Sequence, residues 1–200
     1  MKHLPIVLIY SRLLIGALLL ALSWVGVEHF AAWAVGLLTL GVLTDVFDGI
    51  VARQLGVSTE KLRRLDSTID QLFWALVLAA TYLACPDFFA RNAALLWTLL
   101  GLEALTYAVS YLKFRKEVAT HSWGAKAWVL TSLAALVQLL LTGDSGLLFG
   151  VSFCIGVLSR LEIVAIILLL RKWTNDVPTV YHASRLRQYK AIKLHKLFNG

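Results

Sequence analysis

The sequence predicts an all-α integral membrane protein, and two observations predict it: the composition and the length of the apolar stretches. Of the 200 residues, 59% are hydrophobic and only 16% are charged, and the mean hydropathy is +0.75. Charged side chains are costly in hydrocarbon, so charges gathered between long apolar runs are typical of a chain that crosses a membrane several times. The length argues against several separate domains.

Six transmembrane helices are predicted, because a helix needs about 20 apolar residues to cross roughly 30 Å of hydrocarbon. The six stretches that approach this length are residues 6–25, 30–47, 65–85, 93–112, 127–141 and 147–170. Arg12 near the start of the first stretch predicts an N-terminal interfacial segment, where the long cationic side chain extends to the lipid headgroups. This stretch ends without a small-residue cleavage site, so it is interpreted as a helix and not as a signal peptide.

Lys and Arg are distributed unequally among the connections. The connections after the second and fourth stretches and the C-terminal tail are rich in both, whereas the opposite connections hold Arg91 alone. Cytoplasmic loops retain cations, so both termini are predicted to lie in the cytoplasm. We expect a multi-pass protein of the cell membrane, with a membrane domain at residues 1–173. The basic cytoplasmic tail at 174–200 either lies as a helix on anionic lipid or is solvated.

The basic character of the chain does not indicate a nucleic-acid partner. The formal net charge of +7 arises at the ends of apolar runs, without a basic stripe interleaved with aromatic side chains. Cys85 and Cys154 lie in or beside apolar runs without C-x-x-C spacing, so both are interpreted as packing residues. No glycine-rich phosphate loop or nucleophile elbow is present in the sequence to offer other chemistry.

Aspartates are concentrated between positions 45 and 70, where the second stretch ends and the third begins. The chain has only twelve acidic residues. Five of them fall in this segment, and the four aspartates among them are called the aspartate cluster below: Asp45, Asp48, Asp66 and Asp70. Residues three or four apart share a helix face, so the members of each pair point the same way and the two pairs can face each other.

Four carboxylates near low dielectric repel one another and take up protons unless cations neutralise them. Hard oxygen ligands suit Mg²⁺ or Mn²⁺, so two divalent ions are the predicted cofactors. Two such ions clamp a diphosphate and stabilise the entering and leaving oxygens, which predicts a phosphoryl-type transfer. In the alternative interpretation, the aspartates are surface anions that balance Arg53, Arg63 and Arg64.

The residues around the aspartates form a longer motif. It runs Asp45-x-x-Asp48-Gly49-x-x-Ala52-Arg53, then eight residues, Leu62, three residues, Asp66, three residues and Asp70. This resembles the signature of the CDP-alcohol phosphatidyltransferase family, D-x-x-D-G-x-x-A-R-x8-G-x3-D-x3-D, at seven of its eight fixed positions. Leu62 stands where the family has glycine. The family similarly has six membrane helices, with the motif bridging the second and third on the cytoplasmic side.

The resemblance implies a role for each matching residue. All four members of the aspartate cluster would be metal ligands, and Asp70 would also be the catalytic general base. Three further residues would contact the CDP-alcohol: Gly49, Ala52 and Arg53. The implied reaction of phospholipid biosynthesis transfers a phosphatidyl group from CDP-diacylglycerol to an acceptor hydroxyl and releases CMP. The implied active site lies on the cytoplasmic face of the lipid bilayer, and the resemblance also allows a homodimer.

Basic residues elsewhere favour a phosphorylated acceptor. Three of them are candidates for acceptor binding: Arg115, Lys126 and Arg160. Their side chains suit a phosphate group, which favours glycerol 3-phosphate, with an inositol phosphate second and serine third. The alternatives are that the loop cations only set the topology, and that Arg160 and Glu103, inside predicted spans, bond to neighbouring helices.

Two functions outside the enzyme class are alternatives. A divalent-cation transporter would use the aspartates as ion ligands, but transport predicts ligands near the bilayer midplane and commonly repeated halves. Here the cluster lies toward one end of two helices, and no repeat is apparent in the sequence. An inactive membrane scaffold is the other alternative, chiefly because of Leu62. The motif favours the enzyme.

Overall fold

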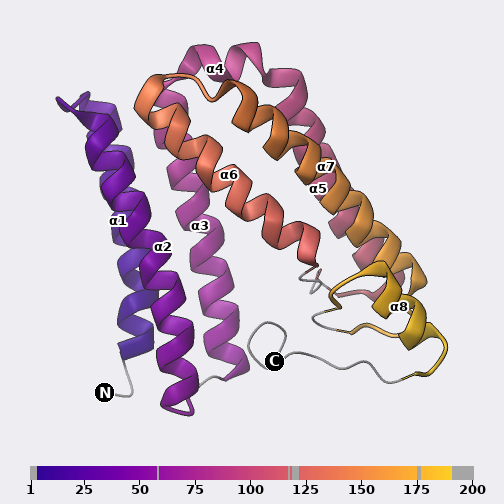
Figure 1. Ribbon diagram of the computed structural model, residues 1–200. Helices are drawn as coiled ribbons and strands as arrows, with labels where there is room; N and C mark the ends of the chain where they lie inside the picture. The colour runs from indigo at the N-terminus through magenta and orange to yellow at the C-terminus, as the bar shows by residue number, and fades with distance from the viewer. Residues whose placement is uncertain (1–3, 58, 117, 119–121, 175–176, 191–200) are drawn as a thin grey trace. The chain divides into compact units, whose positions relative to one another are not determined.

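The computed structural model describes residues 4–57, 59–116, 118, 122–174 and 177–190. Within these ranges the chain forms eight helices and no strand (Figure 1). The helices are α1 (Leu4–Val25), α2 (Phe30–Gln54), α3 (Glu60–Ala84), α4 (Pro86–Arg91), α5 (Ala93–Phe114), α6 (Trp123–Thr142), α7 (Gly146–Leu169) and α8 (Val180–Arg187). The predicted all-α class is confirmed.

Six of the helices are long and apolar enough to cross a bilayer, and they correspond to the six predicted stretches: α1, α2, α3, α5, α6 and α7. Between 11% and 33% of the most apolar window of each helix is buried by protein, so much of the apolar surface is left for lipid. The chain is a multi-span membrane protein. The helices that carry the motif extend beyond the predicted spans, because α2 continues to Gln54 and α3 begins at Glu60.

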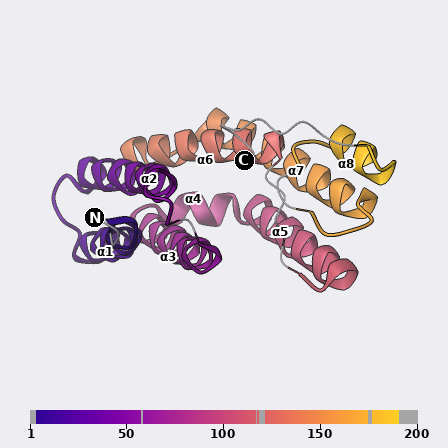
Figure 2. The ribbon, with the colours of Figure 1, turned by 90° about the horizontal axis from the view of Figure 1, so that it is seen from below.

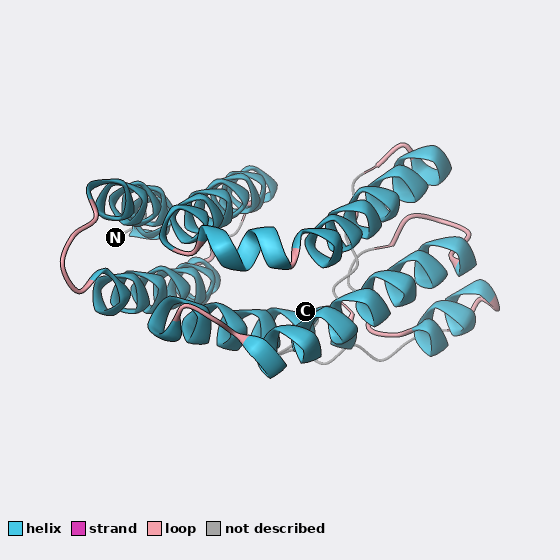
Figure 3. Cartoon of the chain, turned by 90° about the horizontal axis from the view of Figure 1, so that it is seen from above, coloured by secondary structure: helices cyan, strands magenta, loops and turns pink. Residues whose placement is uncertain are grey.

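The chain divides into two compact units. The first comprises residues up to Ala90 together with Leu139–Asp144, and the second comprises Arg91–Gln138 and residues from Ser145 onward. In the first unit α1 packs against both α2 and α3, and Figures 2 and 3 show these three helices nearly end-on. The helix α1 therefore connects the two helices that carry the aspartate cluster.

Each of the three helices contributes a buried stripe whose members are three, four or seven residues apart. On α1 the stripe consists of Pro5, Ile9, Arg12, Gly16 and Leu19. On α2 it includes Ala34, Leu38, Gly41, Asp48 and Ala52, and on α3 it includes Ile69, Phe73, Val77 and Ala80. This spacing is the pattern of helices that pack along a continuous seam. The charged residues of the motif therefore lie in line with the packed core.

Two glycines allow close approach around Phe73, whose side chain is buried. A Cβ atom on Gly41 would overlap the Phe73 ring, and one on Gly16 would lie 3.2 Å from it. Small residues of this kind let membrane helices approach closely. Asp70 precedes Phe73 by three residues and Asp66 precedes it by seven, so all three share one face of α3. The packing of Phe73 thereby turns both aspartates toward α1.

The cysteines of the chain are free and differ in burial. Cys85 lies partly buried after α3, where its Sγ atom is 3.8 Å from the carbonyl oxygen of Leu139. Burial raises the pKa of the Cys85 thiol. The partial burial of Cys85 agrees with a packing role. Cys154 is exposed on α7 within the second unit, so its role as a packing residue stays a prediction.

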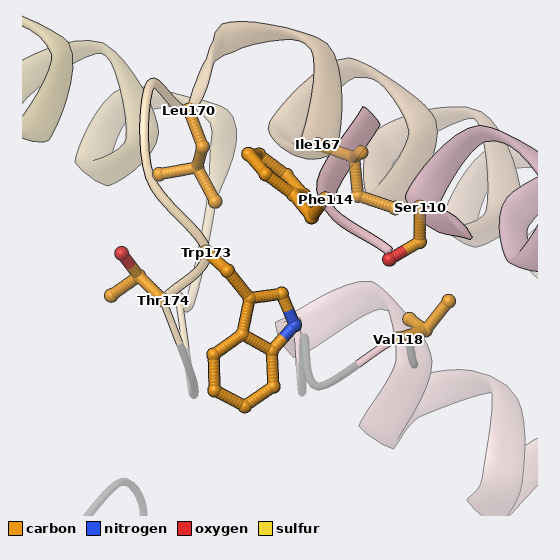
Figure 4. Close-up of a pocket in the computed structure, with 7 residues that line it drawn as sticks. All are labelled: Ser110, Phe114, Val118, Ile167, Leu170, Trp173 and Thr174. Carbon is orange, nitrogen blue, oxygen red and sulfur yellow. The ribbon is translucent and has the colours of Figure 1, made fainter. Parts of the chain in front are cut away.

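In the second unit α7 packs against α5 and α8. After the end of α7 the chain turns back, so that Val177 and Ala183 are buried against Ile166 and Leu170. Figure 4 shows a small cavity nearby, with the ring of Trp173 on one side of it. Its volume of about 10 Å³ holds no more than a water molecule. The start of the predicted tail thus packs on the membrane domain, while the proposed boundary at residue 173 stays a prediction.

Candidate metal centre

The aspartate cluster is assembled by α2 and α3. Carboxylate oxygens of Asp45, Asp48 and Asp66 all lie within 4.8 Å of one another. The expected approach of the two helix faces is therefore found for these three residues. Asp70 contacts the same arginine side chain, Arg12, as the other three aspartates. The two pairs are far apart in the sequence, and the packing of α1 against both helices brings them together.

The cluster is buried on one side and accessible on the other. The side chain of Asp48 is only 4% exposed, whereas those of Asp45, Asp66 and Asp70 are 47%, 31% and 32% exposed. A site of this shape combines a low-dielectric base, where charge interactions are strong, with an opening through which a polar ligand can enter.

Arg12 occupies the middle of the cluster. Its guanidinium contacts all four aspartates: Nη1 lies 2.5 Å from Asp45 and also contacts Asp70, and Nη2 lies 2.5 Å from Asp48 and also contacts Asp66. The Arg12 side chain is completely buried. The prediction that it extends to the lipid headgroups is therefore wrong, because α1 continues from Leu4 to Val25 and turns Arg12 inward along its buried stripe.

The residues present fit a divalent cation. The donors are hard carboxylate oxygens, three of which are close enough together to share an ion. The guanidinium of Arg12 is a positive charge already seated among these oxygens, so it acts as a stand-in for a cation. Sequence reasoning missed Arg12 as a site residue. Its signal was an arginine placed on the apolar face of a membrane helix, a position that calls for an anionic partner.

The other motif residues follow the aspartates along α2 and α3. Ala52 is buried and Gly49 is partly buried, while the side chain of Arg53 lies outside the described residues. Thr59 caps α3, its hydroxyl accepting a hydrogen bond of 3.2 Å from the backbone N–H of Leu62. Leu62 therefore occupies the first turn of a regular helix. The assigned contacts of these residues with the CDP-alcohol remain predictions.

A hollow of about 240 Å³ lies beside this capped turn. Six residues line it: Ile6, Val57, Thr59, Lys61, Leu62 and Leu65. It is bounded by the start of α1, the loop after α2 and the first turns of α3. The position that holds leucine instead of the family's glycine therefore faces a space large enough for part of a small ligand.

The three candidates for acceptor binding belong to the second unit. Arg160 on α7 forms an ion pair with Glu103 on α5, and its guanidinium lies 4.4 Å from the centroid of the Trp128 ring. The ammonium group of Lys126 lies 5.1 Å from the Trp123 ring, and Arg115 stacks over Tyr111 at 5.6 Å. Each cation thus has an aromatic neighbour. Their role in acceptor binding remains a prediction.

The chain combines six helices able to span a membrane with an acidic cluster suited to divalent cations, so it is a multi-span membrane protein with a candidate metal site. The sequence model of the family described as CDP-alcohol phosphatidyltransferase matches residues 2–168. The chain therefore belongs to the CDP-alcohol phosphatidyltransferase family, and the resemblance seen in the motif is confirmed.

A curated relative adds to this assignment. The phosphatidylinositol phosphate synthase of Cutibacterium acnes is 30% identical over 113 residues, which cover 54% of this chain and 52% of the relative. The chain thus matches the relative over about half of the relative's length. No solved structure matches the chain.

Proposed function

We propose that this protein transfers a phosphatidyl group from CDP-diacylglycerol to the hydroxyl of an acceptor alcohol and releases CMP. The convergence of the aspartate cluster of α2 and α3 on one cationic group carries the proposal. Family membership supports it. Four carboxylates carry more negative charge than one guanidinium can neutralise, so the cluster attracts further cations. Mg²⁺ and Mn²⁺ are the cations that serve phosphoryl transfer.

The aspartates have different tasks in this reaction. Asp45, Asp48 and Asp66, together with Asp70, would hold the divalent ions, which when bound would stabilise negative charge on the phosphoryl oxygens and on the leaving CMP. Asp70 is the general base: it accepts the proton of the acceptor hydroxyl. The acceptor oxygen forms a bond to phosphorus while the bond from phosphorus to the CMP oxygen breaks. The Asp70 side chain is 32% exposed, which leaves it accessible to an acceptor.

The donor is held by the remainder of the motif. Gly49 and Ala52 have little side-chain bulk on the turns that follow Asp45 and Asp48, so the diphosphate can approach the helix closely. Arg53 supplies a guanidinium for a phosphate. The hollow beside Leu62 offers space for the cytidine end.

The acceptor is a phosphorylated alcohol in this proposal. The cations Arg115 and Lys126 suit its phosphate, whereas the Arg160 guanidinium is already paired with Glu103. The name of the relative, phosphatidylinositol phosphate synthase, favours an inositol phosphate over glycerol 3-phosphate, and serine stands third. The distribution of Lys and Arg supports a site on the cytoplasmic face of the cell membrane.

The test is release of CMP from CDP-diacylglycerol by the purified protein with Mg²⁺ or Mn²⁺. The acceptor panel contains inositol 1-phosphate, glycerol 3-phosphate, inositol, serine and no acceptor. We expect turnover with one phosphorylated acceptor, and loss of turnover in Asp66→Asn or in EDTA. Turnover only with unphosphorylated alcohols would contradict the cationic acceptor site. No CMP release with any acceptor would favour the inactive scaffold or the transporter.

A further inference from the structure

Arg12 is the most deeply buried charged group of the first unit among the described residues. Its side chain has no exposed surface, and it occupies the α1 stripe between Ile9 and Gly16, where an apolar residue would otherwise pack. A buried charge persists in such a place only when other groups compensate for it. The position of Arg12 therefore depends on the aspartates of the two neighbouring helices.

The contacts of Arg12 join the two aspartate pairs. Nη1 contacts Asp45 of α2 and Asp70 of α3, and Nη2 contacts Asp48 of α2 and Asp66 of α3. Each terminal nitrogen thus bridges one carboxylate from each helix. The Nε atom is buried and has no hydrogen-bond partner, so the guanidinium is not fully satisfied where it stands.

These contacts use the same carboxylates that the proposed metal site uses. Divalent ions seated among Asp45, Asp48 and Asp66 would meet the positive guanidinium at close range, and like charges repel strongly where dielectric screening is low. Arginine does not lose its charge, so it cannot accommodate the ions by deprotonation. The guanidinium and the ions therefore compete for the same carboxylates.

We propose that Arg12 is the counter-cation of the aspartate cluster while no divalent ion is bound, and that its guanidinium leaves the carboxylates when divalent ions bind. The inference rests on the metal site of the proposed function. In the ion-free protein, Arg12 limits repulsion among four carboxylates and keeps α1, α2 and α3 packed. The same competition lowers the affinity of the site for divalent ions. Arg12 of α1 therefore raises the ion concentration at which the site is half occupied.

The experiment is a Mn²⁺ titration of the full chain in detergent after removal of divalent ions, read from the electron paramagnetic resonance of free Mn²⁺. We compare Arg12→Gln and Arg12→Lys with the wild type, and use Lys172→Gln as the control because Lys172 is an exposed cation outside the proposed site. Loss of the competing charge in Arg12→Gln is expected to tighten Mn²⁺ binding by about tenfold or more. Lys172→Gln should change the Mn²⁺ affinity little, because solvent and salt screen its charge.

The stability of the ion-free protein gives a second readout. In EDTA, Arg12→Gln should melt at a lower temperature than the wild type, and Mn²⁺ should raise its melting temperature by more. The melting temperature of Arg12→Lys in EDTA should lie between those of Arg12→Gln and the wild type, because an ammonium group keeps the charge but cannot bridge four carboxylates. If Arg12→Gln folds only when Mn²⁺ is present, the counter-cation role is supported. If it folds under neither condition, Arg12→Lys carries the same test.

Unchanged or weaker Mn²⁺ binding by Arg12→Gln would overturn the inference. Weaker binding in particular would mean that Arg12 holds the carboxylates in position and remains among them with the ions bound. If neither the wild type nor any variant binds Mn²⁺, the metal site itself fails, and the proposed function fails with it. Mn²⁺ binding with normal turnover but no effect of Arg12 would refute this inference alone.

Discussion

The two units of the chain both place charged side chains between membrane helices, and they balance these charges differently. In the second unit one carboxylate, Glu103, meets one guanidinium, Arg160. In the first unit a single guanidinium, Arg12, meets four carboxylates. The first arrangement is neutral by itself, which is sufficient to hold two helices together. The second has an excess of negative charge, and this excess is what a site for divalent cations requires.

Net charge separates the two arrangements more than exposure does. Arg160 lies against the face of Trp128, and a Cβ atom on Gly156 would lie 2.5 Å from the nitrogen of that indole, so the guanidinium and the indole lie in close packing. The Glu103 side chain, however, is 36% exposed, compared with 31% for Asp66 and 32% for Asp70. Both arrangements are therefore partly accessible, and the unbalanced negative charge of the aspartate cluster is what favours binding of a cation there.

The largest expected effect comes from Asp70→Asn. The change removes the proposed general base and keeps the size of the side chain, so CMP release should fall by about 10²–10⁴-fold. Binding of CDP, measured by calorimetry, should be retained. Asp87→Asn, at an exposed acidic residue of α4 in the same unit, is the matched control and should keep full turnover. Near-normal turnover of Asp70→Asn would remove Asp70 from the role of base.

A smaller effect is expected from Glu103→Gln in the second unit. It leaves the Arg160 guanidinium without its counter-charge, so the protein should lose about 1–3 kcal/mol of stability. Thermal unfolding in detergent measures this loss. Arg160→Met combined with Glu103→Gln should restore much of it, because the methionine still packs against Trp128 and no charge is left unpaired.

The same variant also tests the contrast between the units. Glu103→Gln should leave the Mn²⁺ affinity of the chain unchanged, because the Glu103 and Arg160 pair is neutral and belongs to the other unit. A large loss of Mn²⁺ binding would show that the two charge arrangements are coupled, and the distinction between a packing pair and a ligand site would then be wrong.

The smallest effect is expected from Leu62→Gly, which restores the glycine of the family motif. Glycine in the first turn of α3 should cost less than about 1 kcal/mol. The KM for CDP-diacylglycerol should change no more than a few-fold, because the hollow beside Leu62 is already open. Leu65→Gly, in the lining of the same hollow, controls for the loss of a leucine side chain. A large gain of turnover in Leu62→Gly alone would show that Leu62 restricts donor binding.

The sequence predicted much of the site because its residues follow local rules. Asp45 and Asp48 share a face of one helix by spacing alone, and so do Asp66 and Asp70. Six long apolar stretches predicted the six membrane helices. The helix ends were less accurate, since α3 begins several residues before the apolar stretch, where Thr59 caps it with its side chain. A cap depends on side-chain hydrogen bonding, which hydropathy does not report.

The fold class, the six spans and the motif could be predicted from the amino-acid sequence, because helix periodicity and hydropathy are properties of neighbouring residues. The partner of each charged side chain depends instead on how the helices pack. Arg12 pairs with residues that are 33 to 58 positions away, and α1 positions it by packing between α2 and α3. A cation near the end of an apolar stretch has the same sequence signal whether it extends to lipid or turns inward. The choice depends on whether compensating carboxylates lie within its reach.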